Sequence, residues 1–287
     1  MNDITTLRNY NKYTQEQINF IKENYPLYGA TYCSKMIDKP IHCIYPLISR
    51  YNIPKRGRNR EKHPDLMNIN INQFLNIDKI ETAYFLGFLW ADGNIISYRN
   101  KKTNIEQNRI SIGIVTEDAN DILPIINNLG KWFSRTRQRQ HWKEQTDIAT
   151  NNRQLYNFLK DNDYHIKSIG TPTKILKLIP ENLHHYFWRG YFDGDGCLYM
   201  YKTQKCISFC GSYEQEWTSL EILLKQLDIK YSIHRTVDVK RKSKCSKVLI
   251  QNKIGILNLI SYFDPINFCG LKRKTNKMLE FIRLYSS

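Results

Sequence analysis

Two acidic residues stand at equivalent positions of a repeated nine-residue segment. The segment runs from Phe85 to Gly93 in its first copy and from Trp188 to Gly196 in its second, with Gly, Asp and Gly at the third, eighth and ninth positions of both. The eighth positions are Asp92 and Asp195. Paired carboxylates suit a hard divalent cation such as Mg²⁺. The repeat therefore predicts one structural module used twice, with metal chemistry where the copies meet.

Each acid is predicted to end an apolar helix, the first over Lys79 to Ala91 and the second over His184 to Gly194. A carboxylate is unfavourable there, because the helix dipole places partial negative charge at the C-terminus. A divalent cation shared by both acids and by free terminal carbonyl oxygens would offset that repulsion. We therefore expect the acids to act together.

Small residues predict how the two helices pack. Gly87 and Ala91 are one turn apart on the first helix, and Gly190 and Gly194 are one turn apart on the second. Such faces let two backbones approach closely, a use of small residues best documented in membrane helices. If the helices cross through Gly87 and Gly190, Asp92 and Asp195 come together at the base of the interface.

The two repeats share one order of elements: helix, strand pair, helix, strand pair, closing helix. In the first repeat we expect Lys79 to Ala91, Asn94 to Arg99, Arg109 to Val115, Ala119 to Leu129, Trp132 to Trp142, Thr146 to Thr150 and Gln154 to Leu159. In the second we expect His184 to Gly194, Cys197 to Lys202, Lys205 to Gly211, Glu214 to Leu227, Tyr231 to Lys240, Val248 to Ile250 and Gly255 to Tyr262, with a last helix over Lys272 to Tyr285. Strands at hairpin-like spacing among helices indicate an α+β fold with antiparallel sheets.

The first 53 residues are predicted to form three short helices. A Thr14 and Gln17 capping box starts a helix that Pro26 should end near Tyr25, and two more are expected over Gly29 to Ile37 and over Pro40 to Tyr51, the last kinked at Pro46. This segment resembles helix-turn-helix DNA-binding modules. The expected domains are a helix-turn-helix-like domain (1–53), a basic linker (54–77), repeat 1 (78–180) and repeat 2 (181–287). The linker residues Arg56, Arg58 and Arg60 could be a solvated tether or could follow DNA phosphates.

The charge balance points to a polyanionic partner. Lys and Arg total 43 against 27 Asp and Glu, a net charge of +16, so nucleic acid is the first partner to consider. No apolar run approaches the ~20 residues of a membrane-spanning helix. The seven cysteines are scattered and contain no C-x-x-C pair, so we expect reduced thiols and an intracellular protein.

Alternating basic residues on predicted strands would supply a surface for DNA. In the first repeat one face carries Arg135, Arg137, Arg139, His141 and Lys143, and in the second the solvent face carries His234, Lys240 and Lys242. Charged strand faces are often only solvated, but matching stripes in both halves of a basic protein favour contact with phosphates and base edges.

The stretch from about Asp78 to Ser287 resembles the single-chain, two-repeat LAGLIDADG homing endonucleases, whose name comes from this nine-residue motif. The resemblance implies saddle-shaped sheets that lie in the DNA major groove. It further implies that Asp92 and Asp195 are catalytic metal ligands, that Ala91 and Gly194 offer carbonyl oxygens to metal, and that Lys272 and Lys167 assist catalysis. Three residues depart from the family pattern: Ile114 and Cys210 replace a polar strand residue, and Trp90 replaces an acid or small residue of the first motif.

The resemblance implies a monomer with internal pseudo-two-fold symmetry that cuts both strands of DNA at a specific site with Mg²⁺ or Mn²⁺. Its expected location is the cytoplasm of a bacterial or phage-infected cell, or an organelle. Two alternatives remain: an intron RNA maturase on the same fold, and a transcription regulator without nuclease activity, against which both acids argue. A purely structural alternative is that each Asp-Gly pair ends its helix through a left-handed glycine.

Overall fold

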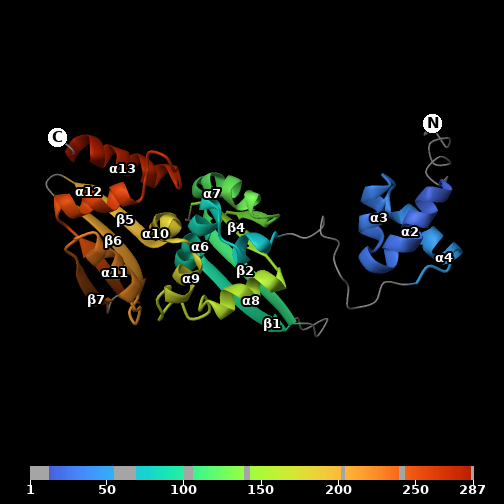
Figure 1. The fold of residues 1–287 in the computed structure, drawn as a ribbon, viewed down its shortest axis with the longest axis horizontal. Coiled ribbons are helices and arrows are strands. Elements are labelled where there is room, and N and C mark those ends of the chain that lie inside the picture. Colours follow the sequence, from blue (N-terminus) through green and yellow to red (C-terminus); the bar gives the residue numbers. More distant parts are fainter. Residues whose placement is uncertain are drawn as a thin grey trace. The chain divides into compact units, whose positions relative to one another are not determined.

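The computed structural model describes residues 13–54, 69–99, 106–138, 143–201, 204–238 and 243–285. The chain divides into two compact units, Met1–Met67 and Asn68–Ser287 (Figure 1). None of the helices among these described residues is long and apolar enough to cross a membrane.

The N-terminal unit contains three helices, α2 (Gln15–Tyr28), α3 (Ala30–Met36) and α4 (Ile41–Arg50), around a small core. The capping box forms as expected, since Thr14 and Gln17 each accept the other's backbone N–H at 3.2 Å. The expected end at Tyr25 is wrong, because α2 continues through Pro26. Proline removes only one N–H there, and the last turn still closes with a 2.9 Å bond from Gly29 N to the Tyr25 carbonyl. α4 likewise runs through Pro46.

The second unit contains the two predicted repeats. The first consists of α6 (Ile80–Asp92), β1 (Gly93–Arg99), β2 (Glu106–Val115), α7 (Thr116–Asn128), β3 (Phe133–Arg137), β4 (Gln145–Thr150) and α8 (Arg153–Asp161). The second consists of α10 (His184–Asp195), β5 (Gly196–Tyr201), β6 (Gln204–Ser212), α11 (Thr218–Gln226), β7 (Ser232–Asp238), β8 (Ser243–Ile250) and α12 (Lys253–Tyr262), and α13 (Lys272–Tyr285) follows it. The sheets have the equivalent strand orders β1-β2-β4-β3 and β5-β6-β8-β7, all antiparallel. The α+β prediction is confirmed.

Three short elements differ from the expectation. The short helix α5 (Asn72–Leu75) lies in the segment that its polarity marked as linker, and Phe74 is fully buried in the core of the repeats. Two more, α9 (Thr173–Leu178) and the 3-10 turn η2 (Glu181–Leu183), fill the connection between the repeats. Helix α11 begins at Thr218 rather than at the expected Glu214. Trp217, the residue before the helix, is anchored by a 3.0 Å hydrogen bond from its ring N–H to Ser246 Oγ.

Helices α6 and α10 lie side by side between the two sheets (Figure 1). Every residue of α6 from Thr82 to Ala91 is buried, as expected of a helix that is apolar all round. A Cβ atom added at Gly87 would overlap the Phe187 carbonyl oxygen, and one added at Gly190 would overlap the Tyr84 carbonyl oxygen. The two helices therefore pack backbone to backbone through these glycines, and their C-terminal ends meet.

Candidate active site

Asp92 and Asp195 are the last residues of α6 and α10. The glycines that follow are not left-handed caps: Gly93 has φ −72° and Gly196 has φ −85°, values open to any residue. Both positions require glycine because there is no space for a side chain: a Cβ atom at Gly93 would overlap Leu89, and one at Gly196 would overlap Phe192. The left-handed-cap explanation of the two Asp-Gly pairs is therefore wrong.

Both carboxylates lie in an environment that disfavours their charge. Burial raises the pKa of Asp92, and the positive charges of Lys274 and Lys167 partly offset the effect. Burial and the charge of Asp92 raise the pKa of Asp195 to about 6, although the positive charges of Lys167 and Lys274 act to lower it. Asp195 is half-buried, whereas Asp92 remains exposed to solvent. Because the charge of Asp92 disfavours that of Asp195, a cation bound between them would be favoured.

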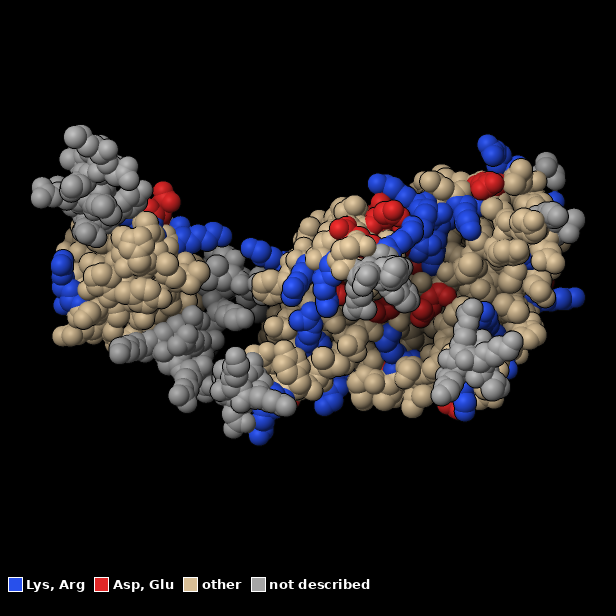
Figure 2. Space-filling model, turned by 180° about the vertical axis from the view of Figure 1, so that it is seen from behind, with Lys and Arg blue, Asp and Glu red and all other residues tan. Residues whose placement is uncertain are grey.

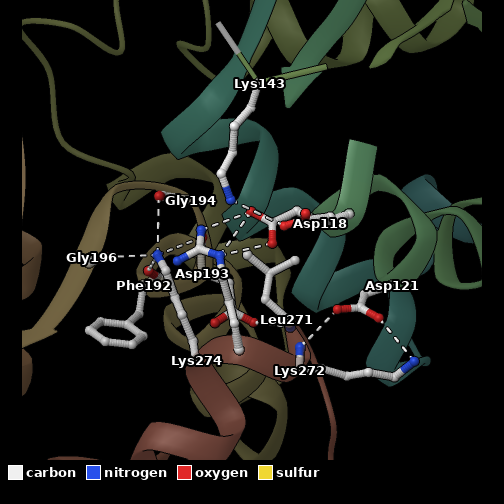
Figure 3. A network of polar contacts seen from close by, with 12 residues as sticks. Asp118, Asp121, Lys143, Phe192, Asp193, Gly194, Gly196, Leu271, Lys272 and Lys274 are labelled. Atoms are coloured by element: carbon white, nitrogen blue, oxygen red, sulfur yellow. Dashed lines mark hydrogen bonds and ion pairs between the residues drawn. The ribbon is translucent and has the colours of Figure 1, made fainter. Parts of the chain in front are cut away.

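Two lysines cap the helix ends beside the acids. The Lys274 ammonium donates to the carbonyl oxygens of Phe192, Asp193 and Gly196 at 2.7 Å each and to that of Gly194 at 3.3 Å (Figure 3). The Lys167 ammonium donates to the carbonyl oxygens of Trp90, at 2.8 Å, and Ala91. Carbonyls that have no partner within a helix are thus satisfied by positive charge. Burial lowers the pKa of Lys167, and it lowers the pKa of Lys274 to about 8.

The structure corrects the choice of lysine in the second repeat. Lys272, predicted at the site, directs its ammonium to Asp121 at 3.1 Å and is largely exposed, whereas Lys274 reaches the end of α10 (Figure 3). Two residues along a helix turn by about 200°, so these two side chains leave α13 on opposite sides. The sequence did carry a signal, because Lys274, Met278 and Phe281 form the buried stripe of that helix at i, i+4 and i+7.

A hollow lies beside each lysine. One of about 310 Å³ is lined by Asp195, Lys167 and Ala91 together with Cys210 and Gln215. Another of about 160 Å³ is lined by residues that include Lys274, Arg273 and Cys197. A larger hollow of about 350 Å³ lies near the opposite end of α10, at His184 and Trp188, too far along the helix to serve the acids. Cys210 and Ile114 are the two strand residues that depart from the family pattern. Cys210 lines the first hollow, whereas Ile114 is buried in the core.

The predicted basic stripes are only partly described. Arg135 and Arg137 are exposed on β3, but Arg137 forms an ion pair with Asp147 on β4. Lys143 lies 3.3 Å from Glu117, and His234 is exposed on β7. The remaining predicted contacts lie outside the described residues: Arg56, Arg58, Arg60, Arg139, His141, Lys240 and Lys242. Figure 2 shows Lys and Arg side chains gathered over the middle of one face of the two-repeat unit, with acidic side chains among them.

Comparison with known proteins supports the resemblance noted from the motifs. Residues 182–263 match the family model described as a LAGLIDADG-like domain. The crystal structure of I-DmoI in complex with DNA and Ca is 18% identical, covers 71% of this chain and 99% of that one, and has a TM-score of 0.51. The meganuclease I-SmaMI bound to uncleaveable DNA is 12% identical, covers 71% of this chain and 89% of that one, and has a TM-score of 0.48. No curated protein sequence matches the chain.

Proposed function

We propose that this chain, whose second repeat is a LAGLIDADG-like domain and whose two-repeat unit has the fold of I-DmoI, is a site-specific double-strand DNA endonuclease that uses Mg²⁺ or Mn²⁺. The observation that carries the proposal is the meeting of Asp92 and Asp195 at the ends of two tightly packed helices, each end bound by the ammonium of a lysine. The similar proteins I-DmoI and I-SmaMI are described as bound to DNA, and I-DmoI also with Ca.

The donor groups fit a hard divalent cation. Within the described parts of the chain, no three His, Cys, Asp or Glu side chains come together as ligands for one ion. Two carboxylates that need further oxygen ligands from water or substrate phosphate suit Mg²⁺, which is commonly held by one or two carboxylates plus phosphate. Asp92 and Asp195 would be the main ligands. The Ala91 and Gly194 carbonyls would be secondary, since Lys167 and Lys274 already donate to them.

When bound, the cation would activate a water molecule and neutralise charge that develops on the scissile phosphate. Asp92 and Asp195 would hold the cation and orient its water rather than attack the phosphate themselves. Lys167 and Lys274, already fixed at the helix ends, would stabilise negative charge as the phosphate reacts, at no cost in reorganisation. Two acids and two lysines would serve the two DNA strands.

DNA would be held by groups outside the acidic centre. Arg135, Arg137, Lys143 and His234 would contact phosphates or base edges from the strands and loops, together with Arg139, His141, Lys240 and Lys242. The N-terminal helices would add contacts as a helix-turn-helix-like domain, with Arg56, Arg58 and Arg60 of the linker on the phosphates. One chain would suffice, because the two repeats supply both halves of the site around a pseudo-two-fold axis.

The retained acids favour a nuclease over the two rival functions. A transcription regulator on this fold would gain nothing from two neighbouring carboxylates, one of which disfavours the charge of the other. An RNA maturase would need a basic surface to bind RNA, and RNA binding does not require a pair of acids. Both rivals bind nucleic acid, so binding alone does not separate them from the nuclease.

The test is cleavage of a duplex library. We expect a randomised DNA duplex, incubated with the protein and Mg²⁺, to yield double-strand ends that share one sequence motif, and no ends when EDTA replaces Mg²⁺. Sequencing of the new ends gives the target and the position of each cut. Selective capture of one DNA motif without breaks in either Mg²⁺ or Mn²⁺ would favour the regulator, and splicing of an intron RNA without DNA cleavage would favour the maturase.

A further inference from the structure

A fully buried ion pair lies on α10 just before its catalytic acid. Arg189 Nε is 3.2 Å from Asp193 Oδ2, one turn apart on the same helix, and neither side chain is exposed. The same carboxylate oxygen accepts from the Tyr84 hydroxyl at 2.8 Å and from the Leu271 backbone N–H at 2.9 Å. Arg189 Nη2 donates to the Thr275 hydroxyl. The pair thus ties α10 to α6 and to the start of α13.

Stability does not explain why this pair is present. Removing two charges from water is costly, and buried pairs are often no better than well-packed apolar residues. Among the described residues, Asp193 Oδ1 and Arg189 Nη1 have no hydrogen-bond partner. Hydrogen bonds therefore only partly offset the free-energy cost of removing the two charges from water. Repeat 1 provides an internal comparison. The motif alignment places Leu86 and Trp90 at the corresponding positions, both buried, so the fold accepts apolar residues there.

The contacts of the pair converge on one side chain. Leu271, the residue before α13, bonds to Asp193, and Thr275, on the first turn of α13, bonds to Arg189; the two flank Lys274. The chain approaches the carboxylate so closely that a Cβ at Gly270 would overlap Asp193 Oδ2. From repeat 1, Asp118 accepts two bonds from Arg273 at 2.8 Å. The turn that carries Lys274 is therefore held from both sides by charged groups (Figure 3).

The other lysine is held by neutral groups. The segment that carries Lys167 is joined to repeat 2 by the Ser212 hydroxyl, which donates to the Ser168 carbonyl, and by the Gln215 amide, which donates to the Gly170 carbonyl. Glu216 N adds a backbone bond to Ile169 O at 3.2 Å. The two lysines therefore occupy similar positions through different supports. Among the described residues, only the support of Lys274 contains a buried ion pair.

We propose that Arg189 and Asp193 are positioning residues that hold Lys274 against the end of α10, so that their loss slows cleavage of one DNA strand and not the other. This inference rests on the proposed endonuclease function. It assigns the buried pair the role of a charged support in one half-site, where repeat 1 has the apolar Leu86 and Trp90. The Trp90 ring packs against Tyr164, in the segment that carries Lys167, at 5.0 Å between ring centroids.

The test compares Asp193→Asn with the double variant that also carries Arg189→Leu. The single variant leaves Arg189 buried without its counter-charge and should be the less stable, whereas the double variant should regain stability. In single-turnover cleavage with each strand labelled separately, the double variant should still cut one strand at least roughly tenfold more slowly and the other within about twofold of wild type. Ile256→Val, a change in the core of the same repeat, should leave the ratio of the two strand rates unchanged.

Two cleavage results would overturn the assignment: an equal slowing of both strands in the double variant, or recovery of the wild-type strand ratio together with stability. The second would mean that the pair serves folding alone.

A readout without DNA separates this inference from the proposed function. Reductive methylation followed by mass spectrometry should modify Lys274 more slowly than exposed Lys272 in the wild-type protein. In the double variant, Lys274 should react at least roughly tenfold faster while Lys167 stays unchanged. A wild-type protein that cuts no duplex, with this acceleration present, would refute the nuclease and retain the positioning role. Unchanged methylation of Lys274 would refute the positioning role whatever the cleavage result.

Discussion

Replacing Asp195 by Asn should make the metal-free protein more stable at neutral and alkaline pH. Burial and the charge of Asp92 raise the pKa of Asp195 from its usual 3.8 to about 6. The folded state therefore binds this proton more tightly than the unfolded state, and stability falls as the pH rises from about 4 through 6. Asparagine has nearly the same shape and carries no charge at any pH, so the variant does not lose that stability.

The size of the effect follows from the shift. At about 1.4 kcal/mol for each pKa unit, the charged Asp195 costs the fold about 3 kcal/mol at pH 8, as an upper value. A change of that size corresponds to several degrees in melting temperature for a unit of this length. The gain should shrink toward zero near pH 4, where both wild type and variant are neutral at this position.

Thermal unfolding followed by circular dichroism at pH 4, 6 and 8 in EDTA measures the difference. Asp161→Asn is a matched control, because Asp161 is also the last residue of a helix, α8, but is exposed. It should show no comparable gain at pH 8. Added Mg²⁺ should stabilise the wild type at pH 8 and stabilise Asp195→Asn much less. A variant that is less stable than wild type at every pH would refute the reasoning and return Asp195 to a structural role.

Three further outcomes are expected. Gly190→Ala should lower the melting temperature by several degrees, because the added Cβ would overlap the Tyr84 carbonyl oxygen. Gly170→Ala is the control and should not lower it, since the nearest atom to its added Cβ is 3.4 Å away. Equal melting temperatures of the two variants would contradict the close packing of the helices. The logarithm of DNA affinity should fall steeply with the logarithm of salt, by ~0.9 for each phosphate neutralised, and a flat response in a titration would contradict the basic surface. Deletion of residues 1–67 should weaken DNA binding in a gel-shift assay yet leave Mg²⁺-dependent cutting at high protein concentration, and a folded remainder that cannot cut would contradict the division of roles.

The order of elements in the second unit could be predicted because local patterns there agree with the tertiary fold. The two motif copies fixed the repeat, the small residues predicted the packing of Gly87 and Gly190, and the alternation of apolar residues marked most strands. The acids could be singled out because a carboxylate at a helix C-terminus is unfavourable without a partner.

Other features depended on contacts between distant segments. The cluster of basic residues at the start of α13 does not by itself tell which one turns inward. The stripe that Lys274 shares with Met278 and Phe281 carries that signal, which the resemblance to the family motif does not use. Phe74 lies in a polar stretch, and only packing against Phe85 reveals that it belongs to the core. Pro26 is a typical helix breaker, yet α2 continues through it, because one missing N–H in a last turn can be tolerated.

Strand-resolved cleavage by Asp92→Asn and Asp195→Asn tests the nuclease assignment most directly. A duplex carrying the selected target, with each strand labelled, is incubated with wild type or variant in saturating Mg²⁺, after fluorescence anisotropy has shown equal DNA affinity. Each variant should remain folded and bind the target as the wild type does, while cutting of both strands falls by orders of magnitude, because carboxylates that share a metal centre act as a unit. Full double-strand cleavage by either folded variant would contradict the assignment of these two acids as the metal-binding centre of an endonuclease.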